Sequence, residues 1–197
     1  MKKLFPVLEY MNVPNLITTL GLASGVAAYY LLTEGHFNGM VLCLFIASLM
    51  DLLDGFIATK MNRQTSFGQG MDSLVDFFVC CAFPVVAAFV TFDSDIFLTI
   101  AALFYCACGL WRLAYYYATS SENRKYFTGI PVPGVMLLVI AALWATLRFE
   151  LPVWVLSATF AIMGLLMISC FKINKYGFCQ KMLGGLWLVF IIVIMAL

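Results

Sequence analysis

The sequence predicts an all-α polytopic membrane protein, and three observations support this fold class. Of its 197 residues, 64% are hydrophobic and only 11% are charged, whereas soluble domains are about 45–50% apolar and about 25% charged. The mean hydropathy is +1.01. The apolar residues fall into runs of about the 20 residues that a membrane-spanning helix needs. With a formal net charge of +1, this composition excludes a soluble globular protein, a disordered chain and a nucleic-acid binder that relies on net charge.

Seven apolar runs are predicted to be membrane-spanning helices. The candidate spans are residues 14–33, 37–59, 71–92, 96–118, 131–147, 151–171 and 182–197. Before the first of them, apolar and charged residues are interleaved over residues 1–13, which is typical of a short helix lying in the membrane interface. A plain cytoplasmic tail is the alternative for that segment. No linker or internal repeat interrupts the chain, so residues 1–197 are expected to form a single membrane domain.

The distribution of basic residues predicts the orientation of the chain. With the N-terminus inside, the outer loops hold Arg148 alone among the 11 Lys and Arg residues. The other basic residues fall on inner segments or at the inner end of the fourth span, namely Lys2, Lys3, Lys60, Arg63, Arg112, Arg124, Lys125, Lys172, Lys175 and Lys181. Because cytoplasmic segments carry an excess of Lys and Arg, we expect a cytoplasmic N-terminus and, if all seven runs cross the membrane, an outer C-terminus.

Four aspartates fall within or next to the second and third candidate spans, where an unpaired carboxylate is costly and by default indicates a functional site. They are Asp51, Asp54, Asp72 and Asp76. The first two are three residues apart and the last two are four apart, so each pair lies on one face of its helix. A short inner loop, expected over residues 60–69, makes the two helices antiparallel neighbours. Both pairs are therefore expected to face one pocket near the cytoplasmic surface.

Carboxylates so close together cannot all remain ionised unless cations neutralise them. Lys60 and Arg63 are too few and lie in the loop. Oxygen ligands suit Mg²⁺ or Mn²⁺, and two divalent ions balance four carboxylates. Metal pairs held in this way typically act on phosphate oxygens. An ion-translocation path or a satisfied polar core is the alternative, although a path usually strings its carboxylates through the depth of the membrane.

Small residues surround these carboxylates and permit the close approach of another group. They are Gly55, Ala58, Ser66, Gly68, Gly70 and Ser73. In a membrane the approaching group is usually a neighbouring helix, but beside a polar cluster a flat ligand fits equally well. Spacing alone leaves both interpretations open.

Residues 51–76 read DLLDGFIATKMNRQTSFGQGMDSLVD, which resembles the signature of the CDP-alcohol phosphotransferases, D-x2-D-G-x2-A-R-x8-G-x3-D-x3-D. Every fixed position matches except Thr59, which stands where the family has arginine. Residues 14–18, PNLIT, are similar to the P-N-x-x-T opening of the family's first span. The family has a core of six membrane helices. The resemblance therefore implies this core over residues 14–171, with an added span over residues 182–197.

The resemblance implies an enzyme that transfers a substituted phosphate from a CDP-linked donor to an alcohol and releases CMP. Carried over by position, it makes Asp51, Asp54 and Asp72 ligands of the divalent metals, whereas Asp76 completes the metal site and is also the general base for the incoming hydroxyl. The positions that it assigns to binding of the donor are Asn15, Thr18, Gly55, Ala58 and Gly68. Thr59 removes one cation from that region. We also expect a homodimer.

A second stretch is similar to the bacterial and archaeal phosphatidylserine synthases of this family. Residues 109–114, GLWRLA, and 127–133, FTGIPVP, resemble their pattern G-x-x-R-L-A-R-F-N … F-x-G-x-P-x-P. Residues 166–169, LMIS, are similar to the L-M-V-S end of their sixth span. Two stretches depart from this group: residues 115–117 are three tyrosines instead of R-F-N, and residues 80–84 read CCAFP instead of F-G-V-A-P.

Arg112 is the predicted acceptor-binding residue, because a cation at the inner end of the fourth span binds a carboxylate or a phosphate. Snorkelling to the interface is its alternative role. The three tyrosines that follow it, together with Trp111, are expected to anchor the helix at the membrane boundary rather than to contact substrate.

The predicted function is an integral, multi-pass enzyme of the cell membrane that uses CDP-diacylglycerol and L-serine, with its active site facing the cytoplasm and membrane lipids around it. Inositol phosphate and glycerol phosphate are alternative acceptors, since Arg112 and the inner-loop cations bind a phosphate equally well. A cation carrier and a catalytically inactive relative are the alternatives from other classes. The complete set of four aspartates argues against an inactive relative.

Overall fold

A computed structural model describes residues 6–61, 64–93, 95–119, 126–174 and 178–196, and this part of the chain is almost entirely helical. In chain order the elements are η1 (Pro6–Tyr10), α1 (Val13–Thr33), α2 (Phe37–Lys60), α3 (Ser66–Asp76), η2 (Phe77–Ala82), α4 (Phe83–Thr91), α5 (Ile96–Ala118), β1 (Tyr126–Thr128), α6 (Val132–Arg148), α7 (Trp154–Met167), β2 (Lys172–Asn174) and α8 (Phe178–Ala196). The all-α polytopic class is confirmed, with one small ribbon of two strands as an addition.

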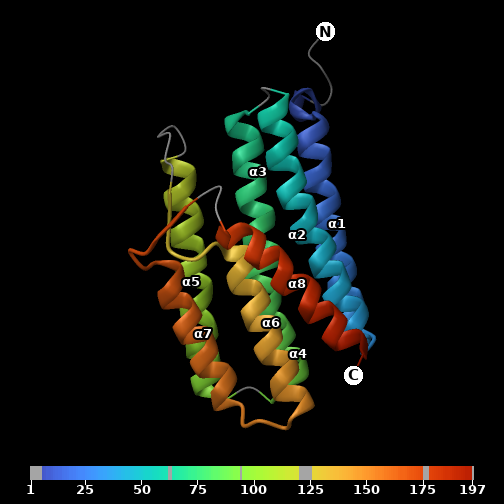
Figure 1. Cartoon of the computed structure of the whole chain (residues 1–197), viewed down its shortest axis with the longest axis vertical. Coiled ribbons are helices and arrows are strands. Elements are labelled where there is room, and N and C mark those ends of the chain that lie inside the picture. The colour runs from blue at the N-terminus through green and yellow to red at the C-terminus, as the bar shows by residue number, and fades with distance from the viewer. Residues whose placement is uncertain (1–5, 62–63, 94, 120–125, 175–177, 197) are drawn as a thin grey trace.

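The helices run alternately up and down a bundle whose long axis is vertical in Figure 1. Helices α1, α3 with α4, and α6 descend in this view, and α2, α5 and α7 ascend. Helix η1 lies at the upper end, whereas α8 ends at the lower one. The predicted number of membrane crossings stays a prediction. The cytoplasmic side of the bundle stays a prediction.

Within the described part of the chain, four helical segments are long and apolar enough to cross a membrane: Val13–Thr33, Phe37–Lys60, Ser66–Thr91 and Ile96–Ala118. They correspond to the first four predicted spans, and the fourth has the predicted bounds. Helices α6 and α7 have 17 and 14 residues, fewer than the ~20 of an ordinary spanning helix. Figure 1 shows that α6 begins, and α7 ends, near the middle height of the bundle.

The third segment starts earlier than predicted and contains a wide turn. Thr65 caps α3, its hydroxyl accepting the N–H of Gly68 at 3.0 Å, so the loop expected over residues 60–69 is shorter. Directly after Asp76 the chain forms the π-helical turn η2. Pro84 has no N–H to donate to the carbonyl of Cys80, and the Tyr105 hydroxyl of α5 donates to that carbonyl instead, at 2.8 Å.

The strands β1 and β2 pair antiparallel, with Thr128 opposite Lys172, and they join the segment before α6 to the segment after α7. The N–H groups of Gly129 and Ile130 donate to Phe171 O and Leu166 O, at 2.8 and 3.2 Å. These bonds draw the chain into an extended path, so α7 ends at Met167 rather than at residue 171 as predicted. Gly129 has a φ of +72°, and a Cβ there would collide with the Met167 carbonyl oxygen.

Helix α8 packs across α2 and α6 and starts at Phe178, four residues before the predicted added span. Trp187 is only 4% exposed, and its ring lies 5.9 Å from that of Phe45 on α2, centroid to centroid. Asn38 donates from Nδ2 to Ile194 O at 3.5 Å. The helix is therefore part of the packed bundle. That it crosses the membrane remains a prediction.

Candidate active site

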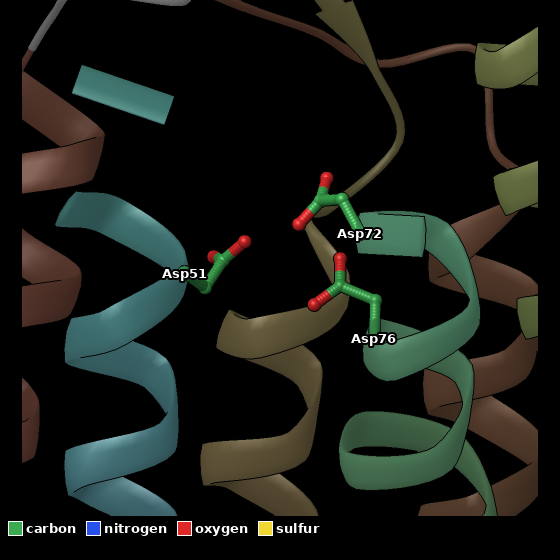
Figure 2. Close-up of side chains that lie close together, drawn as sticks. All are labelled: Asp51, Asp72 and Asp76. Atoms are coloured by element: carbon green, nitrogen blue, oxygen red, sulfur yellow. The ribbon is translucent and has the colours of Figure 1, made fainter. Parts of the chain in front are cut away.

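Three of the four predicted carboxylates converge on one point. Asp51 projects from α2, and Asp72 and Asp76 project from successive turns of α3 toward it (Figure 2). One carboxylate oxygen from each lies within 4.8 Å of the others, and all three side chains are half-buried. The short α2–α3 connection and the i,i+4 spacing predict this juxtaposition. The three are gathered in one cluster rather than strung along the bundle, which does not favour a translocation path.

Asp54 is held differently from the other three. It is 6% exposed and accepts a hydrogen bond at Oδ2 from the hydroxyl of Thr18 on α1. The same hydroxyl lies 3.2 Å from the carbonyl oxygen of Pro14. Asp54 still lines the pocket that contains the cluster, so the structure places all four aspartates around one space and only three of them in mutual contact range.

That space is a hollow of about 310 Å³, including its open mouth, between α1, α2, α3 and the start of α6. It is lined by Thr18, Gly21, Ala47, Ser48, Asp51, Asp54, Asp72, Val75, Asp76, Val79, Cys80 and Pro133. Seven of these residues were not among the predicted site residues: Gly21, Ala47, Ser48, Val75, Val79, Cys80 and Pro133. The i,i+4 spacing from Asp76 to Cys80 is the signal that finds the thiol, whose Sγ lies 3.9 Å from Asp76 Oδ1.

The donor set fits a hard divalent cation. It consists of carboxylate oxygens, which suit Mg²⁺ or Mn²⁺, and their closeness places several negative charges in one half-buried pocket. The guanidinium of Arg112 acts electrostatically on Asp76, but one cation cannot neutralise four carboxylates. Asp51, Asp72 and Asp76 are therefore the residues that could bind a metal ion.

Arg112 lies inside the bundle rather than at its surface. Its side chain is 7% exposed, and its guanidinium carbon is 4.8 Å from the centroid of the Tyr116 ring. The Nε atom has no hydrogen-bond partner among the described residues. This position does not favour the snorkelling alternative. A buried cation with an unused donor is suited to an anionic group that arrives with a substrate.

The five positions assigned to donor binding fall into three groups. Thr18 lines the hollow. Asn15 and Gly68 meet where α1 contacts α3: Asn15 Nδ2 donates to Tyr10 O at 2.8 Å, and a Cβ on Gly68 would lie 2.9 Å from Asn15 Oδ1. Gly55 is exposed with open space beside it, and Ala58 is half-buried. Gly68 thus permits helix packing, whereas Gly55 leaves room for a ligand.

Thr59 stands in place of the arginine of the signature, and its hydroxyl forms hydrogen bonds with nearby residues. Its hydroxyl donates to Gly55 O at 2.8 Å and accepts from Gln64 Nε2 at 2.9 Å. It therefore supplies no charge to the neighbourhood of Gly55.

We expect Thr18→Val to lower the free energy of unfolding by about 1–3 kcal/mol, because it leaves the buried Asp54 carboxylate without its donor. Thr18→Ser retains the hydroxyl and is the matched control, expected to unfold close to the wild-type temperature. Thermal unfolding of the detergent-solubilised protein measures the difference. Equal stability of the valine variant and the wild type would mean that this hydrogen bond contributes nothing.

A carboxylate cluster at a half-buried pocket of a helical membrane protein is typical of sites that handle cations and phosphate groups. The model of the CDP-alcohol phosphatidyltransferase family matches residues 11–196 of this sequence. The chain belongs to the CDP-alcohol phosphatidyltransferase family, and it is an enzyme of that class.

The chain is also similar to individual curated proteins of this family. A CDP-diacylglycerol–serine O-phosphatidyltransferase of Methanocaldococcus jannaschii is 29% identical over 88% of this chain and 79% of its own length. An archaetidylserine synthase of Methanothermobacter thermautotrophicus is 31% identical over 71% of this chain and 60% of its own. A CDP-diacylglycerol–glycerol-3-phosphate 3-phosphatidyltransferase of Aquifex aeolicus is 46% identical, but over only 34% of this chain and 37% of its own.

Proposed function

We propose that this protein transfers the phosphatidyl group from CDP-diacylglycerol to the hydroxyl of L-serine, giving phosphatidylserine and CMP. Two observations carry the proposal: the Asp51–Asp72–Asp76 cluster, and a buried Arg112 whose Nε has no partner among the described residues and whose charge acts on Asp76. The cluster suits the phosphate chemistry, and Arg112 suits the carboxylate of the acceptor. Two relatives that cover most of the chain carry serine in their names.

The proposed cofactor is Mg²⁺ or Mn²⁺, with two ions held by Asp51, Asp72 and Asp76 and with Asp54 as a further ligand. Bound divalent ions neutralise the charge of the diphosphate and of the CMP that leaves. Thr18 keeps the Asp54 carboxylate turned to the hollow. The donor's cytidine and diphosphate are assigned to the neighbourhood of Asn15, Thr18, Gly55, Ala58 and Gly68.

In the proposed chemistry the serine hydroxyl oxygen forms a bond to the phosphorus that carries the diacylglycerol. The bond from that phosphorus to the oxygen of CMP breaks, and the hydroxyl proton passes to Asp76 as general base. Asp76 suits this role because it lies one turn further along α3 than Asp72, at the junction with η2 (Figure 2). Its electrostatic interaction with Arg112, the proposed acceptor-binding residue, also supports this role.

The enzyme is proposed to lie in the cell membrane with this site toward the cytoplasm, as the Lys and Arg distribution indicates. The homodimer implied by the resemblance stays a prediction. Inositol phosphate and glycerol phosphate remain the alternative acceptors, because a buried guanidinium binds phosphate as well as carboxylate. Glycerol phosphate is also supported by the short match to a glycerol-3-phosphate transferase.

The test is CMP release by purified protein with CDP-diacylglycerol, Mn²⁺ or Mg²⁺, and a panel of acceptors. We expect L-serine to be used well, and ethanolamine poorly because it has no carboxylate for Arg112. Inositol phosphate and glycerol phosphate complete the panel. Preference for one of those phosphates would replace serine as the acceptor, and good use of ethanolamine would remove the case for a carboxylate subsite.

A further inference from the structure

Tyr116 connects the end of α5 to strand β1. Its hydroxyl oxygen accepts the backbone N–H of Thr128, and the same hydroxyl lies 2.9 Å from Thr128 O and 3.0 Å from Thr128 Oγ1. The tyrosine hydroxyl therefore accepts one hydrogen bond from the strand and can donate one to the Thr128 carbonyl. A residue expected to anchor the helix in the lipid interface instead holds a segment of the protein.

The ring of the same tyrosine lies against Arg112, one helical turn earlier on α5. A guanidinium over an aromatic face is attracted by the ring quadrupole, and more strongly where water is excluded. Arg112 is 7% exposed, its Nε has no partner among the described residues, and the Tyr116 ring is a contact that can orient its guanidinium. The guanidinium is thus held in place while a donor remains unused.

The β1–β2 ribbon is short, so a contact with α5 such as the one from Tyr116 stabilises it. Strands β1 and β2 have three residues each, and an isolated two-stranded ribbon is marginally stable at best. Strand β1 ends at Thr128 and α6 begins at Val132, so the strand leads almost directly to Pro133, which lines the hollow. Tyr116 therefore contacts both Arg112 and a strand that ends four residues before α6, whose Pro133 lines the pocket.

The hydroxyl of Tyr116 departs from the similar synthase pattern. Tyr116 stands where the similar synthase pattern R-F-N has phenylalanine, so the aromatic ring matches that pattern and the hydroxyl departs from it. The ring and the hydroxyl can be separated experimentally for the same reason, because phenylalanine keeps one and removes the other.

We propose that Tyr116 is a positioning residue that couples the β1–β2 ribbon to Arg112 and thereby sets the affinity for the anionic group of the acceptor. The ring orients the guanidinium, and the hydroxyl holds the ribbon against α5. Neither the proton nor the phosphatidyl group passes through it. This inference rests on the proposed function, in which Arg112 binds the acceptor.

The first arm of the test measures hydrogen exchange at the Thr128 amide, which requires no enzyme activity. In Tyr116→Phe this amide is expected to exchange about 2- to 10-fold faster than in the wild type, because one ordinary hydrogen bond is lost. Tyr117→Phe removes a hydroxyl from the neighbouring exposed tyrosine and is the matched control, expected to leave the exchange unchanged. Unchanged exchange in Tyr116→Phe would overturn the tether.

The second arm measures steady-state kinetics with both substrates. Tyr116→Leu, which removes ring and hydroxyl, is expected to raise the KM for serine about tenfold, with kcat and the KM for CDP-diacylglycerol changed less than about twofold. Tyr116→Phe is expected to raise the KM for serine only two- to threefold, as an order of magnitude for a retained ring. Combined with Arg112→Lys, the effect of Tyr116→Leu is expected to be largely lost, because both act on one contact.

The outcomes separate this inference from the proposed function. If the wild type uses another acceptor from the panel, the kinetic arm is run with that acceptor, and the exchange arm is unaffected. If the wild type turns over serine but Tyr116→Leu leaves its KM unchanged, the positioning role is wrong and the function stands. Equal loss of affinity for donor and acceptor, or additive effects with Arg112→Lys, also overturns the positioning role.

Discussion

Asp76→Asn is expected to lower turnover by at least ~10²-fold while binding of CDP-diacylglycerol remains measurable, as for removal of a general base. The amide cannot take the proton of the incoming hydroxyl, but it has nearly the same shape and still offers one oxygen to the pocket. Asp76 sits at the junction of α3 and η2, beside Cys80 and within the electrostatic reach of Arg112. Its proposed role is therefore in the proton transfer, on the side of the acceptor.

The measurement compares donor affinity and single-turnover rate for Asp76→Asn and Asp51→Asn. Because Asp51 is proposed to act only through the metals, its variant should lose donor affinity together with rate. Asp76→Asn should lose mainly rate. Turnover of the Asp76 variant near the wild-type value would show that the base is another group or that the metals alone activate the hydroxyl.

Removal of divalent cations is expected to stop turnover altogether, and addition of Mn²⁺ or Mg²⁺ to restore it. The physical reason is the charge of the site: carboxylates that approach within 4.8 Å repel a diphosphate unless cations lie between them. Asp72→Asn is expected to raise the Mn²⁺ concentration needed for half-maximal rate about tenfold or more, since one charged ligand is lost.

Asp95→Asn is the matched control for that experiment. Asp95 caps α5 by accepting the N–H of Leu98 at 2.7 Å, and asparagine caps helices equally well. This variant is expected to show the wild-type dependence on Mn²⁺. Full activity of the wild-type protein in excess chelator would contradict the metal assignment.

The departures from the predicted helices have a common cause. Periodicity and hydropathy describe one segment at a time, and they place the bounds of α5 correctly because an apolar run, the Asp95 cap and the end of the run coincide. They fail at the end of α7, where the N–H groups of residues 129 and 130 donate to the carbonyls of residues 171 and 166. Contacts between segments so distant in the chain leave no local pattern.

Part of the candidate site likewise follows from local sequence patterns, and part depends on contacts between distant segments. The spacing of Asp51, Asp72 and Asp76, with a short connection between two apolar helices, is enough to predict that the three carboxylates meet. The matching signature is enough to predict the family, and the match over residues 11–196 agrees with it. The spacing does not predict which partner each carboxylate has inside the pocket. Asp54 belongs to the same signature and is turned to a hydroxyl 36 residues away.

By itself, then, the sequence determined the membrane class, the first four spans and the convergence of the carboxylates, because hydropathy, helical periodicity and a short loop are local properties of the chain. The tertiary structure alone decided which partners the polar side chains have. Thr18 binds Asp54, Tyr116 binds Thr128 and lies against Arg112, and the ribbon shortens α7. In a low-dielectric interior a buried polar group must be paired, and its partner is whichever group packing brings within reach.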